Sequence, residues 1–358
     1  MSHLHEMVRN RGFKCRNVLL DRKEKALVFA ILSLFAVTPL FLPGVAAGAD
    51  TDPVSQCIPG TLGAGALHSC GVQTDGTIDC WGYAFDNFNY SRIDPPPGAF
   101  RQLSAGASHS CGVKMNGTVA CWGNDSYGRA DPPDETFTQV SAGAAHSCGV
   151  KWDGTVACWG IGTTNTGVFY EYGQADPPAG TFAQVSAGDT HTCGVQTDGT
   201  VVCWGEDTAD DRTVPPEGTF TQVSAGKTHN CGLQTDGMIA CWGNDSYGQA
   251  TPPPGTFTQV SVGFAHSCGV QTDEAVACWG AGTFTGQYPP HEGQADPPEG
   301  AFTQVRAGDY HTCGMKTDMT VACWGQDDFG QADPPADLSL ICTIGGGSLL
   351  PVLMLLLD

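Results

Sequence analysis

Short stretches of alternating apolar and polar residues recur from residue 64 to residue 325, and Gly or Pro interrupts them roughly every ten residues. Such alternation indicates half-buried β-strands, and no apolar pattern with the period of a helix persists. One phrase occurs seven times, with a clean copy at residues 220–243. Each copy predicts three strands: a Phe-Thr-Gln-Val segment, a segment from His through Cys-Gly-Val, and a Thr-Val-Ala-Cys-Trp segment.

The spacing of the copies indicates the architecture. The first cysteines of successive copies are separated by 41, 37, 45, 38, 37 and 45 residues. Repeats of about 40 residues with β-type alternation are typical of propeller blades. We therefore predict an all-β fold, a seven-bladed β-propeller with slim blades of about three strands, over residues 50–342.

A Thr-Asp-Gly loop joins the second and third strands and fixes their register, because Asp-Gly suits a three-residue hairpin whose Gly takes a positive φ. Centring the hairpin on Asp236 pairs Cys231 with Cys241 at a non-hydrogen-bonded position. The Cα atoms of such a pair lie about 4.5 Å apart, within the range for a disulfide. Glu274 and Met319 replace the hairpin Gly in two copies, where we expect strain or another turn type.

The same register predicts one disulfide in every copy. Seven pairs at one spacing in an exported chain form a disulfide framework. A zinc ion needs four ligands within reach, which pairs spread over seven blades do not offer, so we expect no metal and no cofactor. The predicted pairs are Cys70–Cys80, Cys111–Cys121, Cys148–Cys158, Cys193–Cys203, Cys231–Cys241, Cys268–Cys278 and Cys313–Cys323.

Two further cysteines flank the repeats, Cys57 before the first copy and Cys342 after the last. The first copy lacks a good first strand, since residues 58–62 replace the Phe-x-Gln-Val pattern. Residues 337–341 follow the last Pro-Pro, where other copies have the first strand of their successor. We therefore expect a C-terminal strand to complete the first blade and a Cys57–Cys342 disulfide to lock the ring.

The two ends of the chain differ from the repeats. Residues 1–25 are basic and precede an apolar run from Ala26 to Leu42 and then small residues, which is the order of a secretory signal. We predict a signal peptide over residues 1–49, with an uncleaved anchor as the alternative. Residues 343–358 are a Gly-rich and then apolar tail, either a sorting signal or a tail without structure. The expected location is secreted, periplasmic or at the cell surface, with membrane contact only through one of these ends.

Loss of the first 49 residues makes the chain more acidic, because they carry 7 Lys+Arg against 3 Asp+Glu. The formal net charge changes from −21 for the whole chain to −25 for residues 50–358. Such a surface repels nucleic acid and keeps a secreted protein soluble and monomeric. We therefore expect no nucleic-acid partner and a monomer.

The phrases Ala-Gly-x-x-His-[Ser/Thr], Asp-Gly-Thr-Val-x-x-Trp-Gly and Tyr-Gly-Gln, the last at residues 247–249, resemble the regulator of chromosome condensation (RCC1) repeat family. The resemblance covers all seven copies and implies a seven-bladed propeller. The short period is similar to that of secreted members such as the propeller-type β-lactamase inhibitor protein, and to the cysteine-containing repeats of plant crinkly receptor kinases. Nucleotide exchange on a nuclear GTPase, the family's best-known activity, is not implied, because export and acidity separate this chain from chromatin.

Seven histidines and seven tryptophans recur at fixed places in the copies. A catalytic group is needed once, so we expect each histidine to make a structural hydrogen bond across the turn between the first and second strands. The Trp after each second cysteine should face away from the disulfide and pack on the adjoining blade. Outside the repeat there is no Ser-His-Asp or paired-carboxylate motif, so we predict no catalytic residues and no enzyme.

The candidate binding residues come from differences in repeat length. Between Trp-Gly and the Pro-Pro that precedes the next copy (Pro297-Pro298 after the sixth), the first copy has four more residues than the shortest copies, and the third and sixth have eight more. Aromatic residues in insertions that the fold does not need are typical of binding surfaces. Third strands end on the side of the Ala-Gly-x-x-His turns, so the insertions should share one rim. The predicted rim residues are Tyr83, Phe85, Phe88, Tyr90, Phe169, Tyr170, Tyr172, Phe284, Tyr288 and His291.

These features predict an extracellular or cell-surface propeller that binds a protein partner at its rim loops, with an inhibitor-like role as one form of that function. A glycan-binding or glycan-hydrolysing propeller is the alternative.

Overall fold

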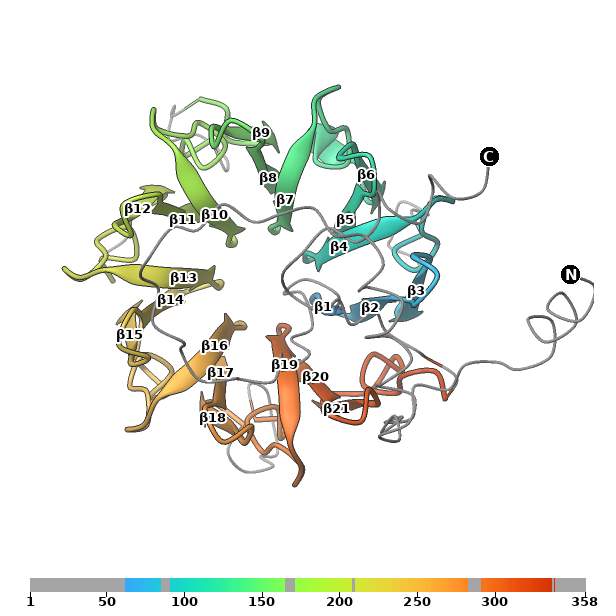
Figure 1. The fold of residues 1–358 in the computed structure, drawn as a ribbon, viewed down its shortest axis with the longest axis vertical. Coiled ribbons are helices and arrows are strands. Elements are labelled where there is room, and N and C mark those ends of the chain that lie inside the picture. Colours follow the sequence, from blue (N-terminus) through green and yellow to red (C-terminus); the bar gives the residue numbers. More distant parts are fainter. Residues whose placement is uncertain are drawn as a thin grey trace, which may run out of the picture. The chain divides into compact units, whose positions relative to one another are not determined.

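The computed structural model describes residues 62–84, 91–164, 171–207, 210–282, 291–336 and 338. These residues form seven antiparallel sheets, each of three consecutive strands. The sheets stand in a ring, and the first strand of each sheet points toward the centre (Figure 1). The predicted seven-bladed all-β propeller is therefore confirmed.

The strands have nearly the same length in every blade. The first strands are β1 (Leu62–Ala64), β4 (Phe100–Ala105), β7 (Phe137–Ala142), β10 (Phe182–Ala187), β13 (Phe220–Ala225), β16 (Phe257–Val262) and β19 (Phe302–Ala307). The second strands are β2 (His68–Val72), β5 (His109–Lys114), β8 (His146–Lys151), β11 (His191–Gln196), β14 (His229–Gln234), β17 (His266–Gln271) and β20 (His311–Lys316). The third strands are β3 (Ile78–Gly82), β6 (Val119–Gly123), β9 (Val156–Gly160), β12 (Val201–Gly205), β15 (Ile239–Gly243), β18 (Val276–Gly280) and β21 (Val321–Gly325). A short 3₁₀ turn, η1 (Ser126–Gly128), follows β6.

Each blade has two ends that matter for function. The turn end carries the Gly-x-x-His turn between the first and second strands, and the third strand also finishes there, since His68 faces Gly82 in the ladder. The hairpin end carries the Thr-Asp-Gly hairpin between the second and third strands. The predicted placement of the post-strand loops on the side of the Gly-x-x-His turns follows from this register.

The hairpin register and the seven disulfides within blades are confirmed. In the fifth blade Leu233 faces Ile239 and Cys231 faces Cys241. All seven predicted pairs are bonded, with Cα atoms 4.0 Å apart and a sequence separation of 10 residues. By the loop-entropy account each such bond contributes about 2–3 kcal/mol.

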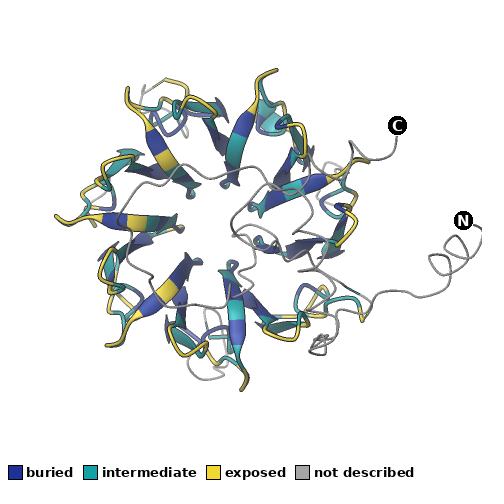
Figure 2. Cartoon of the chain, viewed as in Figure 1, coloured by how far each residue is buried: buried dark blue, intermediate teal, exposed yellow. Residues whose placement is uncertain are grey.

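The hydrophobic core lies between neighbouring blades. In one such cluster Cys111 and Val113 of the second blade pack against Phe137, Val140 and Trp159 of the third. The Trp of each blade therefore faces the preceding blade, and the disulfide faces the following one, as predicted. Buried residues fill the middle of the strands, while exposed residues gather at the outer tips of the blades (Figure 2).

Side chains of the first strands also bridge neighbouring blades. The Gln102 amide donates to the carbonyl of Val140 at 2.9 Å and accepts from the Val140 N–H at 2.9 Å. Ser104 Oγ accepts from the Ala142 N–H at 3.0 Å. These contacts satisfy backbone groups along the free edge of each first strand, which explains why Phe-Thr-Gln-Val-Ser-Ala recurs.

Ring closure agrees only in part with the sequence expectation. The strand β1, which precedes the first Gly-x-x-His turn, pairs with β2 where residues 337–341 were expected. Residues 337 and 339–341 lie outside the described residues, so a C-terminal strand there stays a prediction. The sequence missed β1 because it is only three residues long and lacks the Phe and Gln of the motif. Of residues 337–341 the structure describes Leu338, which packs against Leu62, Trp81 and Met315 as Phe302 packs in the preceding cluster. Cys57 and Cys342 lie outside the described residues.

Two hairpins adopt a backbone conformation that favours glycine. Glu274 has φ 70° and Met319 has φ 74°, close to Gly237 at 84° in the equivalent place. Glu274 donates its N–H to Gln271 O at 3.0 Å, and Met319 donates to Lys316 O at 2.9 Å. The turn type is therefore unchanged, and the expected strain falls on two non-glycine residues.

We predict that Glu274→Gly stabilises the protein by about 1 kcal/mol, because glycine removes the steric cost of the left-handed conformation. Thermal unfolding should show a higher Tm. Thr272→Gly on the same hairpin is the control and should lower the Tm, since it relieves no strain and adds unfolded-state entropy. An equal decrease of the Tm in both variants would contradict the strain argument.

We predict that Leu338→Ala lowers the free energy of unfolding by about 1–3 kcal/mol, because it truncates a side chain in the cluster between the last and first blades. Denaturant unfolding measures the change. Val214→Ala, at a side chain that is 58% exposed, should be neutral. An unchanged stability in the Leu338 variant would mean that the ring closes without the C-terminal segment.

Candidate functional site

The turn ends meet around the central axis through backbone hydrogen bonds. Ala107 N–H donates to Gly143 O at 3.2 Å, Ala144 N–H to Gly188 O at 3.1 Å, and Asp309 N–H to Gly65 O at 3.2 Å across the closing seam. A Cβ on Gly65 would lie 2.3 Å from Gly106 O and 2.7 Å from the His68 ring. Glycine in this turn is therefore required by the close approach of the next blade.

The side chains of the seven repeated histidines form a second circle of contacts between blades. Each Nε2 lies 2.6–2.8 Å from a side-chain oxygen of the next blade, and the seventh reaches the first. The pairs are His68–Ser110, His109–Ser147, His146–Thr192, His191–Asn230, His229–Ser267, His266–Thr312 and His311–Ser69. The histidines thus join blades, and the predicted bond across their own turn is wrong.

The direction of these hydrogen bonds follows from the partners. Thr192 Oγ1 donates to Gln174 O at 2.9 Å, and the Asn230 amide nitrogen donates to Arg212 O at 2.8 Å. Thr192 Oγ1 and Asn230 Oδ1 are then acceptors toward histidine, so Nε2 carries the proton in the neutral ring.

A catalytic interpretation of these pairs fails on access. The imidazoles and their Ser, Thr and Asn partners have no exposed surface. Burial lowers the pKa of His68 to about 3 and that of His191 to about 4. A hydroxyl that is fully buried and already donates to a carbonyl cannot meet a substrate. The circle of histidines and their partners therefore has a structural role.

The mouth of the axis at the turn end is asymmetric. The residue after the turn glycine is Ala in the first three blades and then Asp189, Lys227, Phe264 and Asp309. Lys227 Nζ lies 4.7 Å from the centre of the Phe264 ring, and Tyr310 packs edge-on against Phe264 at 5.4 Å. Burial raises the pKa of the Asp309 carboxyl to about 6, and Lys227 opposes that rise. We call Asp189, Lys227, Phe264, Asp309 and Tyr310 the mouth cluster.

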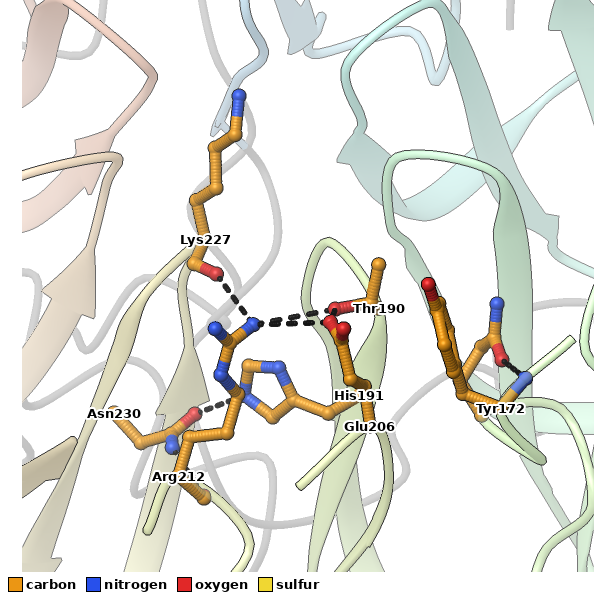
Figure 3. Close-up of polar contacts among 8 residues, drawn as sticks. Tyr172, Thr190, His191, Glu206, Arg212, Lys227 and Asn230 are labelled. Carbon is orange, nitrogen blue, oxygen red and sulfur yellow. Dashed lines mark hydrogen bonds and ion pairs between the residues drawn. The ribbon is translucent and has the colours of Figure 1, made fainter. Parts of the chain in front are cut away.

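A charged group next to the mouth cluster anchors the loop after β12 (Figure 3). Arg212 Nη1 lies 3.6 Å from Glu206 Oε2 and donates to Thr190 Oγ1 at 3.2 Å and to Lys227 O at 3.3 Å. Thr190 Oγ1 donates to Glu206 at 2.5 Å. These contacts hold the loop to the Gly-x-x-His turns of the fourth and fifth blades, so the Arg212 side chain has a structural role.

Three of the predicted rim residues are described, all in loops that leave the turn end. Tyr83 packs on Phe329 with ring centres 4.7 Å apart. His291 accepts from the Gly282 N–H at 3.0 Å and packs edge-on against Tyr247 at 5.9 Å. Tyr172 is half-buried. The other predicted residues, Phe85, Phe88, Tyr90, Phe169, Tyr170, Phe284 and Tyr288, lie outside the described residues.

The sequence interpretation did not select three exposed aromatic residues among those described at the turn end. Tyr127 is 59% exposed, Tyr247 48% and Phe329 44%. They open the Tyr-Gly-Gln phrase, or its Tyr-Gly-Arg and Phe-Gly-Gln forms, which the sequence offered only as a family resemblance. In the structure the Gln249 amide oxygen accepts from the Tyr247 N–H at 2.7 Å, so the backbone of the motif is fixed while its ring faces solvent.

Two properties of the described residues bear on metal binding and on membrane insertion. No group of three or more His, Cys, Asp or Glu side chains in those ranges could hold a metal ion. No helix in the same part of the chain is long and apolar enough to cross a bilayer.

The fold and its disulfides define a β-propeller of three-stranded blades, each with its own disulfide. The model of the regulator of chromosome condensation (RCC1) repeat matches residues 100–129, 182–209, 220–249 and 302–331, so RCC1 repeats are found in four of the seven blades. The family resemblance of the sequence is therefore confirmed.

Solved structures share this architecture. The ectodomain of the Physcomitrella patens receptor kinase CR4 superposes with a TM-score of 0.60 at 24% identity, over 74% of this chain and 73% of that chain. The CRINKLY WD40 ectodomain of Arabidopsis thaliana ACR4 has a TM-score of 0.57 at 25% identity, over 74% and 96%. Yeast RCC1 (Prp20), solved with Kap60, has a TM-score of 0.58 at 15% identity, over 88% and 92%. A search of curated protein sequences finds no match.

We predict that acid destabilises the protein through the histidine ring. Burial lowers the folded pKa to about 3 or 4 in His68, His146, His191, His229, His266 and His311, so between pH 4 and 6.5 the unfolded chain binds more protons. Stability is therefore complete above pH 6.5 and is lost as the pH falls, by up to about 1.4 kcal/mol per pH unit and histidine.

Thermal unfolding from pH 8 to pH 4 measures this dependence. Asp309, whose pKa is raised to about 6, and Asp189, whose pKa is also raised by burial, act in the opposite sense but are outnumbered by the histidines. His229→Gln keeps a donor and removes one titrating ring, so it should reduce the slope by about one proton. A Tm that stays constant across this range would contradict the neutral buried ring.

Proposed function

We propose that the protein is an extracellular or cell-surface interaction module that binds a protein partner through the loops and the mouth cluster at its turn end. The observation that carries this proposal is the contrast between buried and exposed residues of the blades. The repeated His, Gln, Ser, Trp and Cys side chains are largely buried and hold the blades together. The rings of Tyr127, Tyr247 and Phe329 at the turn end are 59%, 48% and 44% exposed and are not packed between the sheets.

The chemistry of these residues supports protein binding. Tyrosine presents a large rigid surface with a polar tip, and aromatic residues dominate the energetics of protein interfaces. Two aromatic pairs, Tyr83 with Phe329 and Tyr247 with His291, join loops of neighbouring blades and so start from ordered positions. Preorganised aromatics lose little entropy on binding, which favours affinity.

The location rests on the covalent bonds and the ends of the chain. Seven disulfides are typical of an oxidising compartment. Residues 1–49 as a signal, residues 50–342 as the propeller and residues 343–358 as a tail remain our division of the chain. Two receptor-kinase ectodomains have the same fold, which is consistent with a place outside the cell. The net charge of −25 for residues 50–358 disfavours nucleic acid.

Glycan binding is the second candidate. Asn124-Asp125-Ser126-Tyr127 recurs as Asn244-Asp245-Ser246-Tyr247, which sets an exposed ring beside amide and carboxylate groups that can bond sugar hydroxyls. Neither candidate requires catalysis, and we propose that the protein is not an enzyme.

The test is a triple variant, Tyr127→Ala with Tyr247→Ala and Phe329→Ala. Chemical cross-linking of the purified protein to native secreted and surface proteins should identify the partner, and titration with that partner should show at least about tenfold weaker binding by the variant. Met238→Ala, at an exposed side chain of the hairpin end, should bind normally.

Two outcomes would redirect this proposal. Full affinity in the triple variant would exclude the turn-end aromatics as the site. Binding to a glycan panel that is lost in the triple variant, with no protein captured, would favour the glycan candidate.

A further inference from the structure

Three residues at the hairpin ends of the second and third blades depart from the repeat. The hairpin position before Asp-Gly is Thr in five blades, but it is Met115 in the second and Trp152 in the third. Arg101 occupies a first-strand position that is Thr or Ala in the five blades that follow. Other described hairpin ends also depart from the repeat, at Met238, Glu274 and Met319, but none of these departures brings in a Trp or an Arg.

The replaced threonines have a structural use. In the fourth blade Thr197 bonds Thr181 at 2.9 Å, and in the fifth Thr235 bonds Thr219 at 3.0 Å. Met115 and Trp152 cannot make this side-chain hydrogen bond. A side-chain hydrogen bond of the repeat is therefore lost in the third blade, where Thr136 remains, and exposed apolar side chains replace two threonines, which is typical of a functional site.

Trp152 is the most exposed large hydrophobic residue of the described part of the chain, at 66%, and Met115 is 59% exposed. The chain has eight Trp, and the other seven occupy the repeat position next to the second cysteine. Trp152 is thus outside the core pattern both in sequence and in burial.

The Trp152 ring is nevertheless held in place. Arg101 Cζ lies 5.7 Å from the ring centre, and the Arg101 guanidinium donates to Phe137 O at 2.7 Å. Trp152 Nε1 lies 3.2 Å from the position of a Cβ on Gly117, so the indole covers the neighbouring hairpin. An anchor fixed by a cation–π contact needs little ordering when a partner binds.

The second-blade side of this surface is basic. Lys114 and Lys151 stand where four other blades have Gln, and Asn116 replaces the hairpin Asp. The carboxylates nearby belong to the third blade: Asp153 accepts from Thr155, Glu135 pairs with Lys151 at 3.2 Å, and Asp134 precedes Glu135. The second-blade hairpin itself has no carboxylate, so Arg101 and Lys114 present positive charge beside Met115 and Trp152.

We propose that Arg101, Met115 and Trp152, with Lys114 beside them, form a second binding surface that takes a protein segment with carboxylates next to an apolar side chain. The apolar side chain would pack on Trp152 and Met115, and the carboxylates would meet Arg101 and Lys114. Trp, Met and Arg are enriched at interface centres, and charge complementarity selects an acidic partner. Two apolar side chains on an acidic protein are a poor membrane anchor, so a protein segment is the occupant favoured here.

The experiment is a selection of random displayed peptides on the purified oxidised protein, with prior subtraction on the variant Arg101→Thr, Met115→Thr and Trp152→Thr. Each change introduces a residue that equivalent blades carry, so the variant should fold, and its Tm checks this. Enriched peptides should combine Asp or Glu with a large apolar residue. A synthetic peptide from this set should bind Trp152→Thr at least about tenfold more weakly than the unchanged protein, and salt should weaken the binding.

Two controls separate this surface from the turn-end site. Met238→Thr, at a 52% exposed residue of another hairpin end, should bind the peptide normally. The Tyr127, Tyr247 and Phe329 alanine variant should also bind it normally, so failure of the proposed function leaves this result unaffected. Neutral or basic enriched peptides, or equal binding by the threonine variant, would overturn the proposal. A blue shift of Trp152 emission on anionic lipid vesicles, without peptide binding, would assign the surface to a membrane instead.

Discussion

The hydrogen bond from each buried histidine to the next blade is the constraint on which the rest of the structure depends. In five of the seven blades the hydroxyl or amide partner donates on to a loop carbonyl, and that carbonyl also accepts from the indole N–H of the repeated Trp. Gln174 O, for example, accepts from Thr192 Oγ1 and from Trp204 Nε1. Two side chains of the next blade therefore fix one carbonyl in each of these loops, and the part of the loop before it can change in length and sequence without disturbing the sheets. This arrangement separates a repeated frame from variable segments.

Much of the fold was predictable because its rules are local. The hairpin register needed only the Asp-Gly turn and the period of a strand, and from that register the disulfides and the face of each Trp followed. The histidine partners were not predictable in the same way, since His146 and Thr192 are 46 residues apart and meet only when two blades are docked. The first blade was misjudged because β1 is short and its cluster is completed by Leu338 from the other end of the chain.

The candidate sites were only partly predictable, for a related reason. Length differences between copies pointed to Tyr83, Tyr172 and His291, but Tyr247 and Phe329 lie in copies without an insertion and so were not selected. Tyr247 combines a structural role with an exposed surface, because Gln249 holds its backbone N–H while its ring faces solvent. Trp152 could have been selected from the sequence, because comparing the copies shows one Trp at a position that is Thr or Met in the other six.

The disulfides have a consequence for how the protein is made. Each joins cysteines of one hairpin, 10 residues apart, and none of the seven links two blades. The nearest free cysteine is the correct partner each time a hairpin emerges into an oxidising compartment, because closing a short loop costs less entropy than closing a long one. These seven bonds can therefore form one hairpin at a time, in the order in which the hairpins enter such a compartment. None of the seven has to wait until the last blade meets the first.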